Sequence, residues 1–176
     1  MKTFDSEDDF ANRGSAIFSR DLRYRYQLTR RWHEGISAPI VFILLNPNNA
    51  DAVRDDPTIR RCVGFAKARG HTALTVVNLF TLRAADPKIL YAADDPIGSR
   101  NDFHIERSIA NASEVIVGWG THGDLMNRGD AIMNKFRDRN LLSFGLTKNR
   151  QPKHPLYLPA DAPLRPLRTL FDKFQR

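Results

Sequence analysis

The sequence predicts an α/β domain, a three-layer sandwich with a central, mainly parallel four-stranded sheet and an N-terminal antiparallel hairpin. Four short apolar runs alternate with segments of helical periodicity along the chain. Uninterrupted apolar runs bounded by turn residues are typical of strands that helices bury on both faces. The alternation of strand and helix then favours parallel pairing, with helices covering both sides of the sheet.

Length and composition fit one domain. The chain has 176 residues, 41% of them hydrophobic, which is enough for one core and short for two. We therefore expect a single domain over residues 15–176, after a polar, aperiodic lead-in over residues 1–14 that we expect to be flexible. The one cysteine, Cys62, excludes a disulfide within the chain. No secretory signal and no apolar run of ~18 residues is present, so we expect a soluble cytoplasmic protein without membrane association.

The N-terminal element is predicted as a hairpin. Between Ser15 and Trp32 apolar residues alternate with polar and basic ones, and Arg20-Asp21 is a candidate turn. The arginines of the polar face could contact phosphate or could protect a sheet edge from pairing with other chains, and we favour the second interpretation.

The remaining elements follow in order. Asp56 and Pro57 predict a helix start, with Asp56 as N-cap and Pro57 at the first helical position. The connection over 81–98 is predicted to be largely irregular, and loops of that length are usually functional or mobile. The predicted buried strands cover 41–45, 73–77, 114–117 and 141–144, and the predicted helices cover 56–69, 88–92, 99–111, 124–137 and 164–174.

The candidate site follows from where the strands end. The first buried run stops at Asn46-Pro47 and gives way to a polar loop, and the second stops at Asn78. Open parallel sheets bind ligands outside the carboxyl ends of their strands, so this edge is where we expect the chemistry. The alternative is that Asn46-Pro47 is only a turn.

The basic excess is concentrated near the C-terminus. Residues 1–133 carry 17 Lys and Arg against 17 Asp and Glu, whereas residues 134–176 carry 10 against 3. Such a concentration is typical of a protein that binds a phosphate backbone, and it makes Lys148, Arg150 and Lys153 candidate nucleic-acid contacts. The alternative is a basic tail that only keeps the protein soluble.

Several motifs together resemble a known family. Over about residues 15–166 the chain resembles an uncharacterised bacterial domain family, domain of unknown function 1643 (DUF1643). More distantly, the order of elements is similar to the uracil-DNA glycosylase superfamily, in which an Asn-Pro strand end, a strand ending in Asn and a late His-Pro segment surround a flipped base. The motifs are Asn46-Pro47, Asp55-Asp56-Pro57-Thr58-Ile59-Arg60-Arg61, Val77-Asn78-Leu79-Phe80, Asp95-Pro96-Ile97-Gly98 and His154-Pro155-Leu156-Tyr157.

The more distant resemblance implies a glycosylase-like fold and a DNA glycosylase-like hydrolase that cleaves the N-glycosidic bond of a modified or deaminated base. It implies that Asn46 positions water, Asn78 reads the base edge and His154 donates to a base oxygen. An amide cannot deprotonate water, so Asp51, the nearest carboxylate of the loop, is the candidate base. Asp51 can equally be a turn residue.

Other candidate substrate-binding residues follow the strand ends, and these are Pro47, Phe80, Trp119, His122 and Tyr157. Trp119 could stack on a base or could be packing. No His, Cys, Asp or Glu cluster has metal spacing, and the turn 118–123 lacks the Lys-Ser/Thr ending of a phosphate loop, so we expect no metal and no cofactor.

The expected partner is nucleic acid, DNA rather than RNA, or a nucleoside or nucleotide, and we expect a monomer. Two alternatives to the glycosylase remain open. One is a binding module that recognises nucleic acid or a nucleotide without turnover, and the other is a hydrolase of a free nucleoside.

Overall fold

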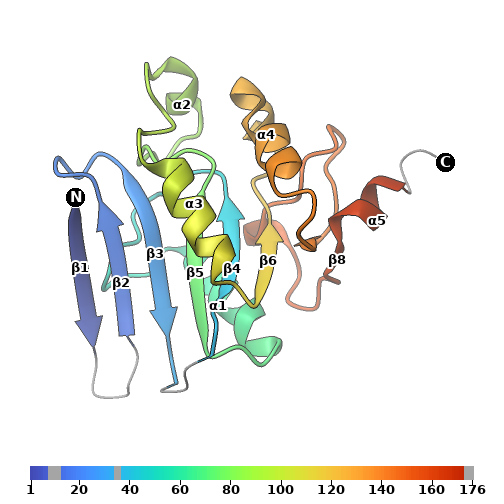
Figure 1. Ribbon diagram of the computed structural model, residues 1–176, viewed down its shortest axis with the longest axis horizontal. Helices are drawn as coiled ribbons and strands as arrows, with labels where there is room; N and C mark the ends of the chain where they lie inside the picture. The colour runs from blue at the N-terminus through green and yellow to red at the C-terminus, as the bar shows by residue number, and fades with distance from the viewer. Residues whose placement is uncertain (8–12, 34–36, 173–176) are drawn as a thin grey trace.

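The structure is a computed structural model that describes residues 1–7, 13–33 and 37–172. These residues form one eight-stranded sheet in the order β1-β2-β3-β5-β4-β6-β7-β8 (Figure 1). The strands are β1 Lys2–Glu7, β2 Arg13–Phe18, β3 Arg25–Arg31, β4 Ile40–Leu44, β5 Ala73–Asn78, β6 Glu114–Val117, β7 Leu141–Ser143 and β8 Arg165–Pro166.

The middle of the sheet contains the four buried strands that the apolar runs predict. β5, β4, β6 and β7 lie side by side in this order, and all three pairs between them are parallel. Phe42 and Ile43 point to opposite faces of β4, and both are 0% exposed. The α/β class is therefore confirmed, and β4 lies between β5 and β6.

The sheet as a whole is larger than four strands and is not mainly parallel, which corrects the prediction. The hairpin β2-β3 continues the sheet, because β3 pairs with β5 in antiparallel fashion. Residues 2–7, predicted as a flexible lead-in, form the edge strand β1 on β2, and β8 adds antiparallel to β7. An edge strand is held by backbone hydrogen bonds and needs no buried face, so its sequence shows little apolar periodicity.

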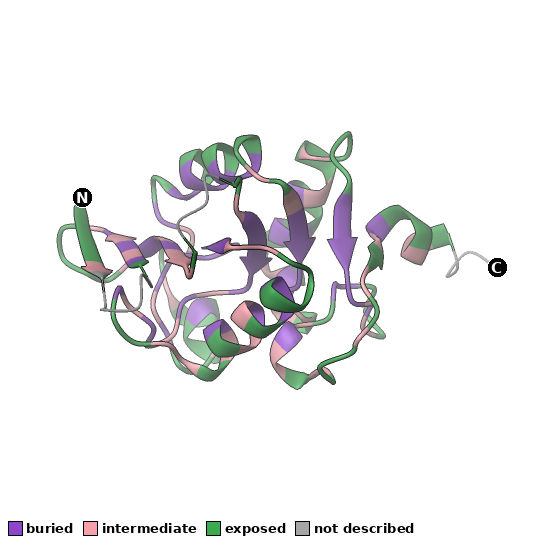
Figure 2. Cartoon of the chain, turned by 90° about the horizontal axis from the view of Figure 1, so that it is seen from below, coloured by how far each residue is buried: buried purple, intermediate pink, exposed green. Residues whose placement is uncertain are grey.

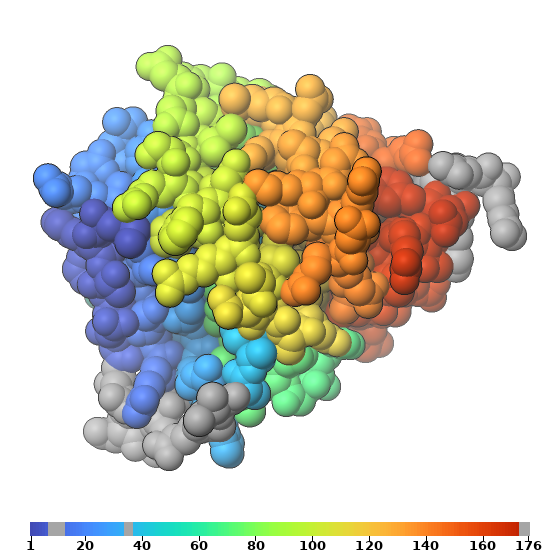
Figure 3. All heavy atoms as spheres, viewed as in Figure 1, coloured from blue at the N-terminus to red at the C-terminus, as the bar shows by residue number. Residues whose placement is uncertain are grey.

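Helices cover both faces of the parallel strands (Figure 1), and Figure 3 shows the face that residues 101–110 and 128–135 cover, in yellow and orange. One core cluster joins Val41, Ile43 and Val77 to α3 (Asn101–Ala110) and α4 (Arg128–Lys135), and a second joins Phe42 and Leu74 to α1 (Pro57–Ala68). Figure 2 shows the buried strands between these helical layers. The helices are α1 Pro57–Ala68, α2 Lys88–Ala92, α3 Asn101–Ala110, α4 Arg128–Lys135 and α5 Leu167–Asp172. In the part of the chain that the structure describes, no helix is long and apolar enough to cross a membrane.

The predicted helix start at Asp56 is confirmed, since its Oδ1 accepts a hydrogen bond from the Ile59 N–H at 2.9 Å. The predicted helix 124–137 is wrong at its beginning. A 3₁₀ segment, Thr121–Asn127, precedes α4, because Met126 and Asn127 have φ values of 55° and 54° and so interrupt the helix.

The ends of two further helices differ from the prediction. α3 is capped at Arg100 rather than at Ser99. α5 begins after Pro166, and the last two predicted helical residues, 173–174, lie outside the described residues.

Candidate functional site

A pocket of about 620 Å³ lies at the carboxyl ends of β4 and β6. It collects residues from five segments, which are the loop after β4, the start of the helix at 57–68, the long connection after β5, the turn after β6 and the chain after β7 that includes the His-Pro segment. The lining residues are Leu45, Asn46, Asn48, Thr58, Ala84, Ala85, Pro87, Trp119, Gly120, Thr121, His122, Thr147, Lys153, His154, Leu156, Tyr157 and Leu158.

The side chain of Asn46 has a fixed orientation. Its amide nitrogen donates to the Ala84 carbonyl at 2.8 Å and to the Pro47 carbonyl at 3.1 Å. The Ala84 N–H donates back to the Pro47 carbonyl at 3.0 Å, so the Asn-Pro turn and residue 84 hold each other. Because both donor bonds go to protein, the group that Asn46 can offer a ligand is its Oδ1 acceptor.

His154 enters the pocket as a neutral ring. Burial lowers its pKa to about 4, and the carboxylate of Asp56 opposes this shift without cancelling it. Nδ1 accepts a hydrogen bond from the Leu156 N–H at 3.3 Å, which leaves the ring proton on Nε2. At neutral pH His154 is therefore an uncharged hydrogen-bond donor.

Trp119 packs inside the protein rather than presenting a free ring to the pocket. It is 1% exposed, and its indole N–H donates to Gln151 Oε1 at 2.6 Å. A Cβ on Gly123 would lie 1.8 Å from the Trp119 ring, so the glycine is required for the indole to fit. The glycines of the turn 118–123 thus allow the end of β6 to pack closely against residues 151–155.

Gly118 has the matching role on the other side of this contact. A Cβ there would lie 3.0 Å from the Lys153 carbonyl oxygen and 3.1 Å from Pro155 Cδ. Without that carbon, the extended segment that carries His154 passes directly over the end of β6 and beside β4. The Gly120 N–H then binds the Pro152 carbonyl at 2.7 Å.

Asn78 lies outside this pocket. It is 1% exposed and faces the antiparallel side of the sheet, where its Oδ1 accepts from Arg25 Nη2 at 3.4 Å. The backbone carbonyls of Asn78 and Leu79 both accept from the buried amide of Asn101. The end of β5 is therefore part of a buried polar network that joins β3, β5 and α3.

Asp51 also does not line the pocket, and its side chain instead stabilises the turn that follows it. Its Oδ1 accepts from the Val53 N–H at 2.9 Å and the Arg54 N–H at 2.8 Å. Burial acts to raise its pKa, but these two hydrogen bonds and nearby arginines lower the pKa below its ordinary value. Such a carboxylate is stabilised in its ionised form and is a weak base.

The other predicted residues divide into two groups. Asn46, Trp119, His122, Lys153, His154 and Tyr157 line the pocket, whereas Pro47, Asp51, Asn78, Phe80, Lys148 and Arg150 do not. Phe80 is fully buried in the core beside α3. Lys148 and Arg150 are exposed on the turn that begins at pocket-lining Thr147, and with Lys153 we call them the basic rim. The Arg150 guanidinium lies over the Phe171 ring of α5, 5.6 Å from the ring centroid.

Several lining residues were not predicted from the sequence, chiefly Asn48, Thr58, Ala84 and Thr147. The sequence could have indicated Asn48, because this residue follows Asn46-Pro47 within the same polar loop. The sequence could not have indicated Ala84, because nothing in the pattern of an irregular connection distinguishes one small apolar residue from another. Its contribution is the backbone carbonyl that orients Asn46.

The pocket contains amide, hydroxyl, imidazole and ammonium groups, and none of its described lining residues is Asp or Glu. Within residues 1–7, 13–33 and 37–172, no group of three or more His, Cys, Asp or Glu side chains is placed to hold a metal ion. These groups can donate to and accept from a neutral polar ligand, and Lys153 adds a positive charge for an anionic one.

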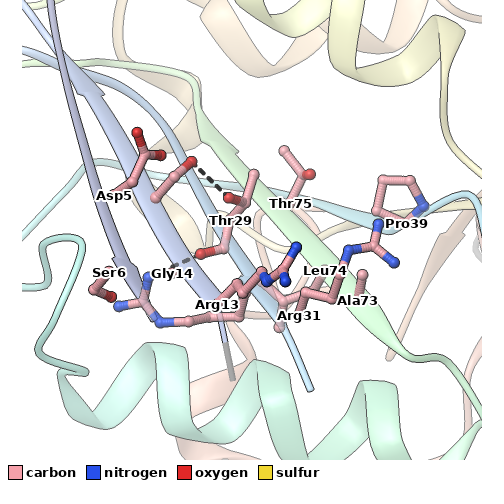
Figure 4. A pocket seen from close by; sticks show the side chains of 12 residues that line it. Asp5, Ser6, Arg13, Gly14, Thr29, Arg31, Pro39, Ala73, Leu74 and Thr75 are labelled. Atoms are coloured by element: carbon pink, nitrogen blue, oxygen red, sulfur yellow. Dashed lines mark hydrogen bonds between the residues drawn. The ribbon is translucent and has the colours of Figure 1, made fainter. Parts of the chain in front are cut away.

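A second hollow of about 590 Å³ lies across the antiparallel strands β1, β2, β3 and β5 (Figure 4). Its centre is a row of aligned polar side chains, with Ser15 and Thr29 joined by a 2.8 Å hydrogen bond. It lies where β1 and β3 end and where β2 and β5 begin, so it is at the amino ends of the parallel strands, opposite the edge at which such sheets bind ligands. The pocket around Asn46 and His154 is therefore the candidate functional site.

The fold and the pocket define a mixed α/β domain with a polar pocket at the carboxyl edge of its parallel strands. The chain belongs to the family described as protein of unknown function (DUF1643), whose model matches residues 25–156. That range includes most of the pocket, from Leu45 to Leu156. No curated protein and no solved structure matches the chain.

Proposed function

We propose that the protein is an N-glycosidic hydrolase that cleaves a modified or deaminated base from nucleic acid, with the pocket between the ends of β4 and β6 as its active site. The observation that carries the proposal is the pairing, in one pocket, of the oriented Asn46 Oδ1 with the uncharged Nε2–H donor of His154. The motif resemblance to uracil-DNA glycosylases supports the same reading.

The two groups match the charges that develop in this reaction. As the bond breaks, negative charge moves onto the departing base and positive charge onto the sugar. The Nε2–H of His154 would donate a hydrogen bond to the base oxygen that gains charge, and the neutral ring would keep its proton throughout. Asn46 Oδ1 would hold the attacking water by accepting one of its hydrogens.

The absence of Asp and Glu among the described lining residues restricts the mechanism. Asn46 can orient water but cannot remove its proton. The rate must then come from stabilising the departing base, with water adding late to a sugar that already carries positive charge. The proton of that water would pass to solvent or to a substrate phosphate.

The rim suits a polymeric substrate. Lys148 and Arg150 are exposed on the turn beside Thr147, and Lys153 lies at the pocket edge. Phosphates on either side of a base held in the pocket would meet these cations. This arrangement favours nucleic acid over a free nucleoside as the substrate.

A single-turnover assay tests the proposal. Oligonucleotides, each carrying one base from a panel of deaminated and modified bases, are incubated with excess protein and then treated with alkali to cut at abasic sites. We expect strand scission at one or a few of these bases. Tight, base-selective binding without scission would instead favour a binding module.

A further inference from the structure

We propose that Asn48, rather than Asn78, reads the ligand in the pocket, and that its ligands carry an N–H donor beside a carbonyl oxygen, as the ring of uracil or hypoxanthine does. This inference rests on the proposed function for the position of the ligand but concerns recognition rather than cleavage.

The amide oxygen of Asn48 is an acceptor in need of a donor. This Oδ1 is buried, and no group among the described residues donates a hydrogen bond to it. Asn48 nevertheless lines the pocket, two residues beyond Asn46. A buried acceptor without a donor is unfavourable, and a ligand N–H is the group that would satisfy it.

Asn46, Asn48 and Asn78 follow or end strands at this edge of the sheet, and they differ in what they can still bind. Asn78 Oδ1 is already used by Arg25, and its side chain is outside the pocket. Both amide hydrogens of Asn46 are bound to backbone carbonyls, so the side chain can only accept a hydrogen bond from a ligand, through Oδ1. Asn48 is the remaining amide that can distinguish one ligand edge from another.

His154 supplies the complementary group. It offers an N–H donor, because its Nδ1 is occupied by the Leu156 N–H. A donor from His154 and an acceptor from Asn48 together match a ligand that presents a carbonyl oxygen and an N–H. With no Asp or Glu among the described lining residues, the pocket also has no carboxylate to compete for that N–H.

Binding of small ring probes tests this assignment independently of cleavage. The probes are 1-methyluracil, which has a carbonyl beside an N–H, and two rings that lack this N–H, 1,3-dimethyluracil and 1-methyl-2-pyridone. Titrations are followed by amide NMR spectra of the full chain. We expect the wild-type protein to bind 1-methyluracil roughly tenfold more tightly than either other ring.

Variants at position 48 identify the atom responsible. Asn48→Ala should remove the preference, whereas Asn48→Asp should keep it, because an ionised carboxylate still accepts from the N–H. Asn49→Ala is the matched control, since Asn49 is the exposed neighbour in the same loop. Melting temperatures of all three variants confirm that each one is folded.

Four results would overturn the assignment: no binding of 1-methyluracil, equal binding of the three rings, a preference that survives Asn48→Ala, or a preference lost in Asn48→Asp. The oligonucleotide assay reports separately on the proposed function. Scission without a role for Asn48 refutes this inference alone, and ring discrimination without scission refutes the hydrolase alone.

Discussion

His104 is a buried histidine with no evident role in the pocket. It is 2% exposed, its ring stacks on Tyr26 at 5.1 Å between centroids, and neither ring nitrogen has a hydrogen-bond partner among the described residues. Burial, with Arg100 and Arg107 nearby, lowers its pKa to about 4. The folded protein therefore holds this ring neutral.

This histidine should make stability depend on pH. Between the folded pKa of about 4 and the ordinary value of about 6.5, the unfolded chain binds more protons, so the free energy of unfolding falls as pH falls. At about pH 5 the loss is on the order of 2 kcal/mol. We expect His104→Phe to raise the melting temperature there by several degrees and to change it little near neutral pH. Equal effects at both pH values would contradict this explanation.

His154 has the same lowered pKa for a functional reason. We expect side-chain NMR to show a neutral ring protonated on Nε2 at neutral pH, and the neutral form to persist to about pH 5, well below the ordinary histidine value. A titration midpoint near the ordinary value of about 6.5 would contradict the buried, neutral donor that the proposal requires.

Asn78 is expected to act on stability alone. Asn78→Ala leaves the buried Arg25 guanidinium without one of its two side-chain hydrogen bonds, which should cost about 1–3 kcal/mol. Its melting temperature should fall while the ratio of affinities for 1-methyluracil and 1,3-dimethyluracil stays at the wild-type value. A change in that ratio would show that Asn78 contributes to ligand recognition.

At the scale of elements, the late His-Pro segment depends on the turn after β6. Gly118→Ala places a methyl group 3.0 Å from the Lys153 carbonyl, so residues 153–155 must shift by a few tenths of an ångström. We expect activity or ligand binding to fall more than stability, because His154 moves with this segment. The measurement is scission rate and melting temperature on the same sample.

Gly64→Ala is the control for that change. Gly64 lies inside α1, and a Cβ there would meet no atom within 4 Å. Replacing a helical glycine with alanine should raise stability by about 0.5–1 kcal/mol and leave the pocket unchanged. If Gly118→Ala behaves like Gly64→Ala, the turn does not position His154.

Buried strands were predictable from the sequence, whereas the edges of the sheet were not. Strands such as β4 are apolar on both faces, so the run 41–45 identifies them without further information. β1 and β8 are held by backbone pairing to neighbours, and their own side chains carry little signal. The start of α4 was misplaced because Met126 precedes Asn127 in left-handed geometry, which is unusual for methionine although asparagine adopts it more readily.

The candidate site was predictable only in part, for a related reason. The position of a residue at a strand end can be read from the sequence, which identified Asn46 and, with the His-Pro motif, His154. The direction in which a side chain points depends on its neighbours. Asn78 ends its strand as predicted, but Arg25 on the adjacent antiparallel strand binds it, and no pattern in the sequence indicates that contact.

At the scale of the whole molecule, the basic rim should make DNA binding depend on salt. Removing one cation that binds a phosphate should flatten the slope of log affinity against log salt concentration by about 0.9 on duplex DNA. We therefore expect the triple alanine variant of Lys148, Arg150 and Lys153 to have a shallower slope than the wild type. Fluorescence anisotropy over a range of salt concentrations measures it.

The control for this experiment removes three exposed basic residues that do not line the pocket, Arg60, Lys67 and Arg107. This variant has the same net charge as the rim variant, so a difference between them reports position rather than total charge. Equal slopes in the two variants would show that the rim has no special part in binding.

The central claim is that the pocket at the ends of β4 and β6 performs the chemistry, and the most direct measurement is the single-turnover rate of base excision in three proteins. These are the wild type, Asn46→Ala and His154→Ala, each checked for an unchanged melting transition. We predict excision of at least one base by the wild type, and a rate about 10²–10³-fold lower when His154 is replaced. Excision that proceeds at the wild-type rate in both variants, or no excision of any base in the panel, would contradict the claim.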